Sequence, residues 1–313
     1  MKKHFLMGLM TLAGVSMLTS CQQDEQVSEP LQSPSHLQVK ATIGALGNET
    51  RALKTNTVFD AGDELGLYVT NAAGTALYNT SSGNIKATKS GTGWTLAQTI
   101  ALSSTAGKVY AYFPYSATES SVISGMNTIA VKPGQTDYMW GISDEVTASS
   151  PKADIKMKHA LSCIIVKLSN QGSPNGCLLS GSSLQNASAS VFYKDGTMNI
   201  TTGAITPGTA ENLSYTQDAN FKNSQVSLQH LVLPTGKNIA SGDCKFVFTI
   251  DGKQYAYNVP ALTGGYKAGF KYTYSFVMKG SDLVLDEDDP SGNGGISITP
   301  WEDGGEIDGG TFE

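Results

Sequence analysis

The stretch YTYSFV at residues 272–277 and the stretch KFVFTI at residues 245–250 indicate most clearly which fold this chain adopts. Both are rich in aromatic and β-branched residues, which suit the pleated, half-buried surface of a sheet. Similar short stretches occur at residues 65–69, 109–113, 129–131, 162–168 and 255–259. Gly, Asn, Ser and Pro separate them, and no apolar stripe with helical spacing continues over a dozen residues. The pattern predicts an all-β fold built from β-sandwiches.

A polar stretch from Ser143 to Pro151 separates two groups of these predicted strands. We therefore expect an N-terminal β-sandwich domain at residues 37–150 and a C-terminal one at residues 151–313. The large apolar side chains of the alternating stretches should form the cores. Those expected to be mostly buried are Leu65, Tyr112, Val166, Phe246, Phe248 and Tyr274.

The composition narrows the classes of function. Hydrophobic residues make up 40% of the 313 residues, charged residues make up 15%, and the formal net charge is −6 at pH 7. The apolar content is sufficient for packed cores. The few Lys and Arg residues are spread thinly in an acidic chain, which suits phosphate backbones poorly. We expect no nucleic-acid partner.

The first 20 residues resemble the signal peptide of an exported protein. Lys2 and Lys3 precede an apolar run that ends at Leu18 and is too short to span a membrane stably. The run leads into LTSC at residues 18–21, which resembles the lipobox of bacterial lipoproteins. In that family the signal is cut before the cysteine and a diacylglycerol is attached to its thiol, so Cys21 is the expected lipidation site. An ordinary signal peptide with a chance cysteine is the alternative.

Residues 21–36 are expected to form a lipidated, flexible tether. They are rich in Gln, Ser, Glu and Pro and show no apolar period. The sequence QQDE at residues 22–25 is similar to a short acidic signal that sends some lipoproteins to the outer cell surface. These features predict a location in the cell outer membrane, facing the extracellular surface.

Patterns of catalytic and metal-binding residues give no candidate. The sequence contains no GxSxG, no P-loop lysine, no HExxH and no CxxC, and the acids at residues 286–289 break the spacing of a calcium loop. Besides Cys21 there are Cys163, Cys177 and Cys244, of which the first and third lie in strand-like stretches and are expected in the core. We expect no catalytic residue, no metal and no cofactor. A glycosidase-like pair of carboxylates stays open, because its geometry is not visible in a sequence.

Aromatic residues are concentrated between residues 110 and 140. They could form a platform for a sugar, although alternating strands favour a role in the core. The residues concerned are Tyr110, Tyr112, Phe113, Tyr115, Tyr138 and Trp140.

Several segments, taken in order, resemble the fimbrillin family of surface lipoproteins, the subunits of protease-assembled pili. They read FDAGDELGLY at residues 59–68, YAYFPY at 110–115, DYMWG at 137–141, KHALS at 158–162, AGFKYTYSF at 268–276 and ITPWEDG at 298–304. The match runs from the lipobox almost to the C-terminus. It implies two β-sandwich domains of transthyretin-like topology in tandem, in agreement with the division near residue 150.

The resemblance also implies a route of assembly. Precursors of the family are cut after an arginine near the N-terminus, which removes the lipid anchor and the first strand. The only nearby arginine is Arg51, followed by Ala52, and a plain loop arginine is the alternative. Ahead of it lies the alternation of a half-buried strand. Its apolar residues, expected to leave an open groove when displaced on maturation, are Leu37, Val39, Ala41 and Ile43.

The opposite end of the chain offers a candidate donor strand. In residues 296–301, Ile296 and Ile298 alternate with polar residues behind a Gly-rich stretch. Alternatively, this segment packs as the last strand of its own domain, with Trp301 capping the core. The expected partners are other pilin subunits, the outer membrane through the lipid anchor, and a host or bacterial surface ligand. The leading interpretation is a pilus subunit or adhesin; a surface carbohydrate-binding lipoprotein is the second, and a hydrolase the third.

Overall fold

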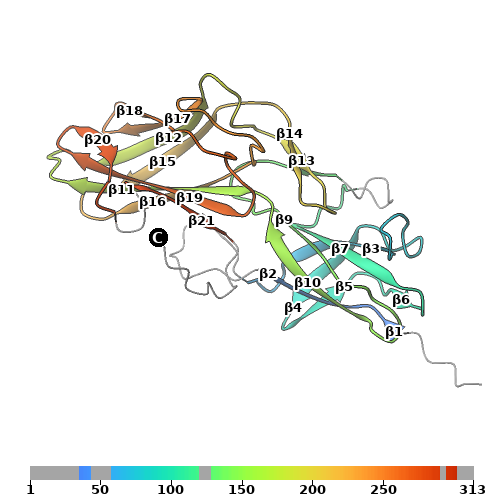
Figure 1. Cartoon of the computed structure of the whole chain (residues 1–313). Helices are drawn as coiled ribbons and strands as arrows, with labels where there is room; N and C mark the ends of the chain where they lie inside the picture. Colours follow the sequence, from blue (N-terminus) through green and yellow to red (C-terminus); the bar gives the residue numbers. More distant parts are fainter. Residues whose placement is uncertain (1–34, 44–57, 120–127, 290–293, 302–313) are drawn as a thin grey trace, which may run out of the picture. The chain divides into compact units, whose positions relative to one another are not determined.

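The computed structural model describes residues 35–43, 58–119, 128–289 and 294–301. These residues form 21 β-strands and no helix, which confirms the predicted all-β fold (Figure 1). All seven stretches that were selected by composition overlap strands. In the part of the chain that is described, no helix is long and apolar enough to cross a membrane.

The largest sheet contains seven strands. In spatial order they are β2 (Gln38–Ile43), β10 (Lys152–His159), β9 (Met139–Ile142), β7 (Gly107–Phe113), β3 (Glu64–Asn71), β4 (Ile85–Ser90) and β5 (Gly93–Leu96). β2 runs parallel to β10, whereas the other neighbours are antiparallel. β2 and β5 are therefore the edges of this sheet.

The burial of each strand explains its sequence pattern. β3 is buried on both faces, with Leu65, Leu67 and Val69 in one core and Tyr68 in another, so it has a continuous apolar run. β2 buries one face, so exposed and buried residues alternate strictly along it. The strand predicted from the alternation at residues 37–43 is confirmed for Gln38–Ile43, and the buried Leu37 directly precedes it.

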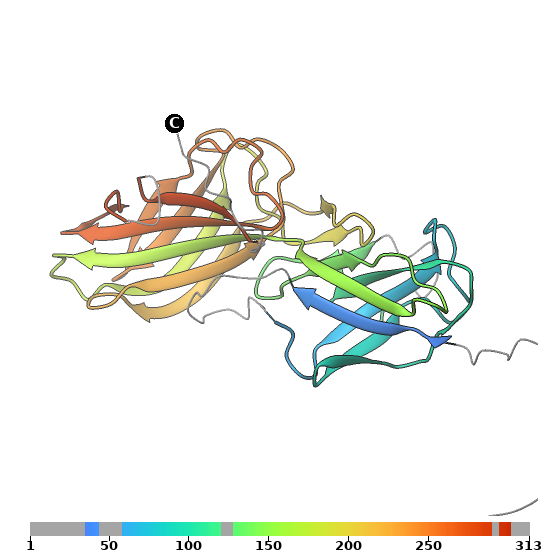
Figure 2. The same ribbon diagram turned by 60° about the horizontal axis from the view of Figure 1, so that its bottom comes forward.

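Two further sheets face each other as a sandwich (Figures 1 and 2). One contains, in order, β16 (Val226–Val232), β11 (Ser162–Gln171), β19 (Phe270–Lys279) and β20 (Asp282–Leu285), and β21 (Ile296–Pro300) also pairs with β19. The other contains β15 (Leu213–Asn220), β12 (Leu178–Asn186), β17 (Cys244–Ile250) and β18 (Lys253–Asn258). Aromatic rings join the layers, since Phe246 meets Tyr274 edge to face at 4.8 Å between ring centroids. All six side chains expected to be buried are at most 1% exposed.

Two small sheets complete the fold. One pairs β1 (Ser35–His36) with β6 (Ala101–Leu102), and the other contains β14 (Ile205–Pro207), β13 (Gly196–Met198) and β8 (Ile129–Val131). β10 begins at Lys152 and belongs to the sheet of β2, and β8 pairs with β13 from the second half of the chain. The division into residues 37–150 and 151–313 stays a prediction.

The three cysteines beyond residue 21 lie in the core. Cys163, Cys177 and Cys244 are buried and free. Burial raises the pKa of the Cys163 and Cys244 thiols to about 12, which leaves them protonated at neutral pH. Because the thiolate is the reactive form, these two residues are packing groups rather than nucleophiles.

The packing of Gly66 gives a first prediction. A Cβ atom at this position of β3 would lie 2.0 Å from Cε1 of Tyr112, a fully buried ring on β7 whose hydroxyl donates to Asn84 Oδ1 at 2.7 Å. We expect Gly66→Ala to lower the free energy of unfolding by about 1–3 kcal/mol, because the ring has no room to move. Gly93→Ala on β5 is the control, since its nearest atom would be 4.0 Å away. Equal urea midpoints for the two variants would contradict this packing.

Candidate functional site

The residues expected to be processed are not among those described. Cys21, Arg51 and Ala52 all lie outside the described ranges, so their roles stay predictions. The structure does place the two segments that were expected to take part in strand exchange.

β2 combines a buried face with a position at the edge of its sheet. Its residues from Gln38 to Ile43 pair in register with the segment of β10 from Lys152 to Met157. The apolar side chains are 6–8% exposed, and they are Leu37, Val39, Ala41 and Ile43. As an edge strand, β2 forms its ladder of hydrogen bonds with one neighbour only, β10.

β21 lies on the chain's own β19. It pairs with the first half of β19, from Phe270 to Tyr274, while β20 pairs with the second half of the same edge. Ile296 is half-buried and Ile298 is 49% exposed. The alternative raised from the sequence, in which this segment packs within its own chain, is thus the arrangement seen here.

Trp301 holds the end of β21 in place. Its indole is fully buried and stacks on the imidazole of His159, with ring centroids 4.1 Å apart and planes 4° apart. Its backbone N–H donates to the Gly269 carbonyl at 2.5 Å. The same imidazole also contacts Asp137: His159 Nδ1 lies 2.9–3.0 Å from the two carboxylate oxygens of Asp137. Burial raises the pKa of Asp137, and the adjacent His159 acts in the opposite direction.

This cluster, which we call the Trp301 lock (Asp137, His159 and Trp301), brings three of the family-like segments together. Asp137 comes from DYMWG, His159 from KHALS, and Trp301 from ITPWEDG. The motifs were visible in the sequence, but their contact was not, because more than a hundred residues separate His159 from Trp301. The Trp301 lock therefore gives one residue of each of these three motifs a role in packing.

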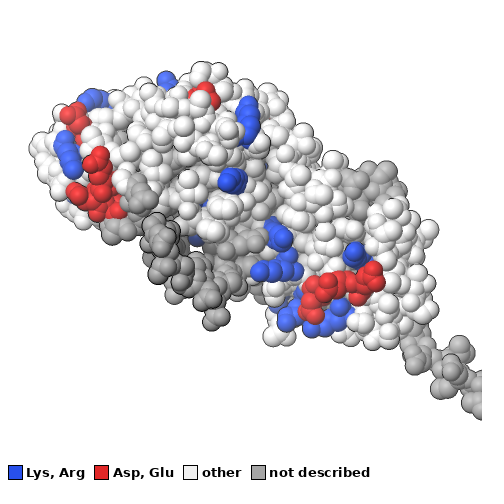
Figure 3. Space-filling view, viewed as in Figure 1, with Lys and Arg blue, Asp and Glu red and all other residues white. Residues whose placement is uncertain are grey.

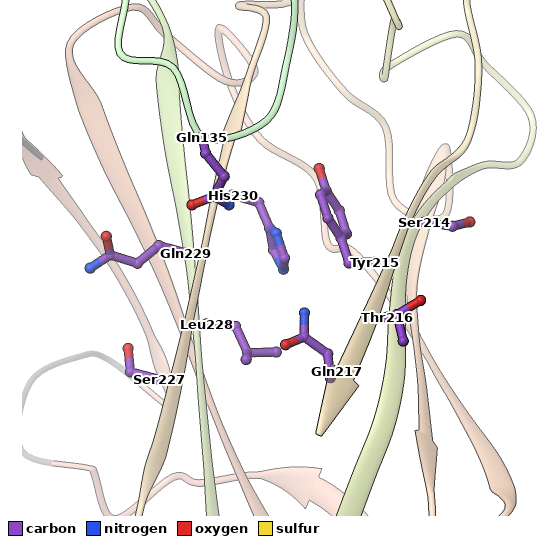
Figure 4. A pocket seen from close by; sticks show the side chains of 9 residues that line it. All are labelled: Gln135, Ser214, Tyr215, Thr216, Gln217, Ser227, Leu228, Gln229 and His230. Atoms are coloured by element: carbon purple, nitrogen blue, oxygen red, sulfur yellow. The ribbon is translucent and has the colours of Figure 1, made fainter. Parts of the chain in front are cut away.

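A polar groove lies between β15 and β16, the edge strands of the two sandwich sheets. We call it the edge groove; it has a volume of about 520 Å³ and is lined by residues 214–217, residues 227–230 and Gln135. Figure 4 shows the rings of Tyr215 and His230 facing each other between the two strands, with Gln135 at one end. The two rings stack at 4.0 Å between centroids. No motif in the sequence marks this site, because its residues alternate as those of ordinary edge strands do.

Both rings of the edge groove are uncharged at neutral pH. Burial lowers the pKa of His230 to about 4 and raises the pKa of Tyr215 to about 12. His230 Nδ1 is buried and has no hydrogen-bond partner among the described residues. A buried polar atom of this kind is normally satisfied by water or by a bound molecule.

The aromatic residues weighed as a sugar platform are mostly part of the core. Tyr110 and Tyr112 are buried, and the remaining four are half-buried. The paired carboxylates at residues 63 and 64 have separate structural roles: Asp63 Oδ2 accepts the Asp60 N–H at 2.8 Å, and Glu64 pairs with Lys86 at 2.9 Å.

The charged side chains on the face shown in Figure 3 form small, separate groups of both signs. No continuous basic surface is present on this face. Within the described ranges, no group of three or more His, Cys, Asp or Glu residues is placed to hold a metal ion.

Two sheets packed face to face on an aromatic core define this chain as a β-sandwich protein. The family model of the fimbrillin-like proteins matches residues 50–301, and the chain belongs to this family. Membership indicates a structural, non-enzymatic protein at the cell surface that assembles with other pilin subunits.

Solved structures with a similar fold have low sequence identity. A protein from Bacteroides uniformis assigned to cell adhesion has a TM-score of 0.63 at 19% identity, covering 86% of this chain and 99% of its own. One with the same assignment from Bacteroides ovatus has a TM-score of 0.61 at 16% identity, covering 86% and 99%. A fimbrial protein from Bacteroides vulgatus has a TM-score of 0.53 at 13% identity, covering 85% and 99%. No curated protein matches the sequence.

Proposed function

We propose that this chain is a subunit of a surface pilus or a fimbrillin-like adhesin, exported as a lipoprotein precursor and polymerised by donor-strand exchange after cleavage at Arg51. The observation that carries the proposal is β2, an edge strand with one apolar face that ends eight residues before Arg51. Cleavage there would separate β2 from the rest of the chain.

The energetics of β2 suit a strand that stays bound until it is cut. Burying a large aliphatic side chain contributes about 1.5–3 kcal/mol, and β2 with the preceding Leu37 buries several. While the chain is intact, the strand is also held covalently next to its groove. After cleavage it becomes a dissociable peptide, and its loss exposes an apolar groove and the unpaired edge of β10. Such an edge recruits a strand from another chain.

β21 is the donor that we propose. Its apolar residues Ile296 and Ile298 alternate with polar residues, as in a strand. In the sequence, a Gly-rich stretch precedes it and Trp301 follows it. Its outward-facing Ile298 is available to a second surface. To act in another subunit, β21 must leave β19 and Trp301 must leave its contact with His159.

Arg51 makes the cleavage step unusually testable, because it is the only arginine in the sequence. An Arg-specific protease should cut the purified precursor once and produce polymers, visible by electron microscopy and size-exclusion chromatography. We expect Arg51→Lys, which keeps the charge, to abolish polymerisation. Lys54→Ala, three residues away, is the matched control and should assemble normally. Normal polymers from Arg51→Lys would remove the cleavage step from the proposal.

Deletion of residues 296–313 tests the donor separately. We expect the cut deletion variant to remain monomeric, since it retains the groove and lacks β21. Normal polymers would leave the cleavage step standing and would exclude β21 as the donor.

The lipid anchor has its own test. Cys21→Ala should abolish incorporation of a fatty-acid analogue and release the precursor from the membrane fraction, because the thiol that carries the diacylglycerol is gone. Ser20→Ala is a suitable control, since it keeps a small residue before Cys21. A Cys21→Ala protein that still carries the label in the membrane fraction would rule out this anchor.

A further inference from the structure

We propose that the edge groove between β15 and β16 binds an uncharged glycan. This inference goes beyond assembly and does not rest on strand exchange, because the groove lies on the side of the sandwich opposite to β18 and β20 in the sheet order.

The lining of the groove is polar without being charged. Besides the apolar Leu228, its residues carry amides, hydroxyls, one phenol and one imidazole, and none is Lys, Arg, Asp or Glu. A phosphorylated or carboxylated ligand would lose hydration there without gaining an ion pair. The polar side chains that point between the two strands are those of Tyr215, Gln217 and His230, with Gln135 at one end (Figure 4). They accept and donate hydrogen bonds, as a ligand rich in hydroxyl groups does.

The floor of the groove combines an apolar ring face with an unsatisfied nitrogen. Tyr215 is half-buried and offers a flat surface of the kind on which apolar C–H groups pack. The stacked His230 is only 2% exposed, and its Nδ1 has no hydrogen-bond partner among the described residues. A neutral imidazole has one donor and one acceptor nitrogen, and so can bind either end of a hydroxyl group.

Two glutamine side chains are placed to orient a bound sugar in the groove. Gln135 stands at one end, and Gln217 reaches in between the strands from β15 (Figure 4). Each amide presents a donor and an acceptor side by side, which is suited to neighbouring hydroxyl groups on one ring. The volume of about 520 Å³ lies in the range of small-molecule sites and is large enough for a short oligosaccharide.

An added β-strand is the competing occupant, and the structure disfavours it. The outer edge of β16 already pairs with Gly134: the Gly134 N–H donates to the Leu231 carbonyl at 3.0 Å, and the Leu231 N–H donates to the Gly134 carbonyl at 3.2 Å. A strand added along the full length of this edge, as far as Leu231, would have to displace Gly134. A glycan held by side chains between the sheets leaves this pairing intact.

The test uses the purified full chain without protease. A printed array should carry neutral oligosaccharides of hexoses, N-acetylhexosamines and deoxyhexoses, together with their sialylated and uronic-acid counterparts. The strongest neutral binder is then titrated by calorimetry against Gln217→Ala, His230→Phe and the control Gln254→Ala. Gln254 is an exposed glutamine on β18, at the opposite edge of the sandwich. Thermal unfolding confirms that each variant is folded.

We expect at least one neutral oligosaccharide to bind, and Gln217→Ala and His230→Phe to weaken it about tenfold, the loss from one removed hydrogen-bonding group. Gln254→Ala should bind as the unchanged chain does. The partly exposed Gln217 keeps the test decisive if His230→Phe fails to fold. Absence of binding, binding of acidic glycans alone, or full affinity in Gln217→Ala would overturn the proposal. The proposal would also be overturned if the occupant were a protein partner that pairs with β16 in place of the sugar and protects the main-chain amides of β16 from hydrogen exchange.

The glycan test and the assembly test fail independently. A chain that polymerises but binds no neutral glycan counts only against the edge groove. A chain that binds the glycan but stays monomeric after cleavage counts only against strand exchange.

Discussion

Trp301→Ala is expected to lower the free energy of unfolding by about 3–5 kcal/mol, the usual loss for removing a buried Trp side chain. The indole is fully buried, and the variant would leave a cavity over the imidazole of His159. The effect should not be confined to the mutated position. Because Trp301 follows β21 directly, its loss should also loosen the pairing of β21 with β19.

Two measurements check this expectation. Urea unfolding gives the change in stability, and hydrogen exchange should show faster exchange for amides of β21 and of the paired half of β19. Ile298→Ala is the matched control in the same strand, since Ile298 is 49% exposed and its truncation should cost little. A Trp301→Ala protein as stable as Ile298→Ala would show that the Trp301 lock does not hold the segment.

His230 should make the stability of the protein fall in mild acid. Its pKa is about 4 in the folded chain, against 6.5 in the unfolded chain, because burial disfavours the charged form. The unfolded state therefore binds a proton below pH 6.5 that the folded state does not accept until about pH 4. Stability is unaffected above pH 6.5 and decreases as the pH falls through this window, by about 3 kcal/mol at the lower end.

The variant His230→Phe isolates this contribution. Phenylalanine keeps a ring against Tyr215 and does not titrate. As the pH falls from 6.5 to 4, the free energy of unfolding of the variant should therefore rise relative to that of the unchanged protein. Urea unfolding at several pH values measures this difference. Parallel stability curves for the two proteins would show that His230 is protonated in the folded state and that the burial described here is wrong.

The sequence predicted the strands well and their partners poorly. The composition at residues 272–277 and 245–250 gave β19 and β17, and the alternation from Leu37 to Ile43 gave β2, since side-chain periodicity is a local property. The pairing of β2 with β10 joins residues more than a hundred positions apart. Nothing in the local pattern of either strand encodes that contact, which depends on how the whole sheet is assembled.

The candidate sites differ in the same way. The Trp301 lock uses residues that had been noted as motifs, but the stacking of Trp301 on His159 follows from tertiary packing. The edge groove was not predicted, because Tyr215 and Gln217 alternate with exposed polar residues as in any strand at a sheet edge. Only the juxtaposition of two sheet edges turns these side chains into a site.

The parallel pairing of β2 with β10 has a consequence for the form of any polymer built on it. A strand that takes the place of β2 in the same register must run in the same direction and point the same alternate side chains inward. Each junction would then join two unlike surfaces, a donor strand and an acceptor edge, and repeating an unlike pair of surfaces gives an open chain rather than a closed pair. Such a fibre is polar. One terminus carries an empty acceptor and the other an unused donor, so growth has a direction and a subunit without a donor strand brings it to a stop.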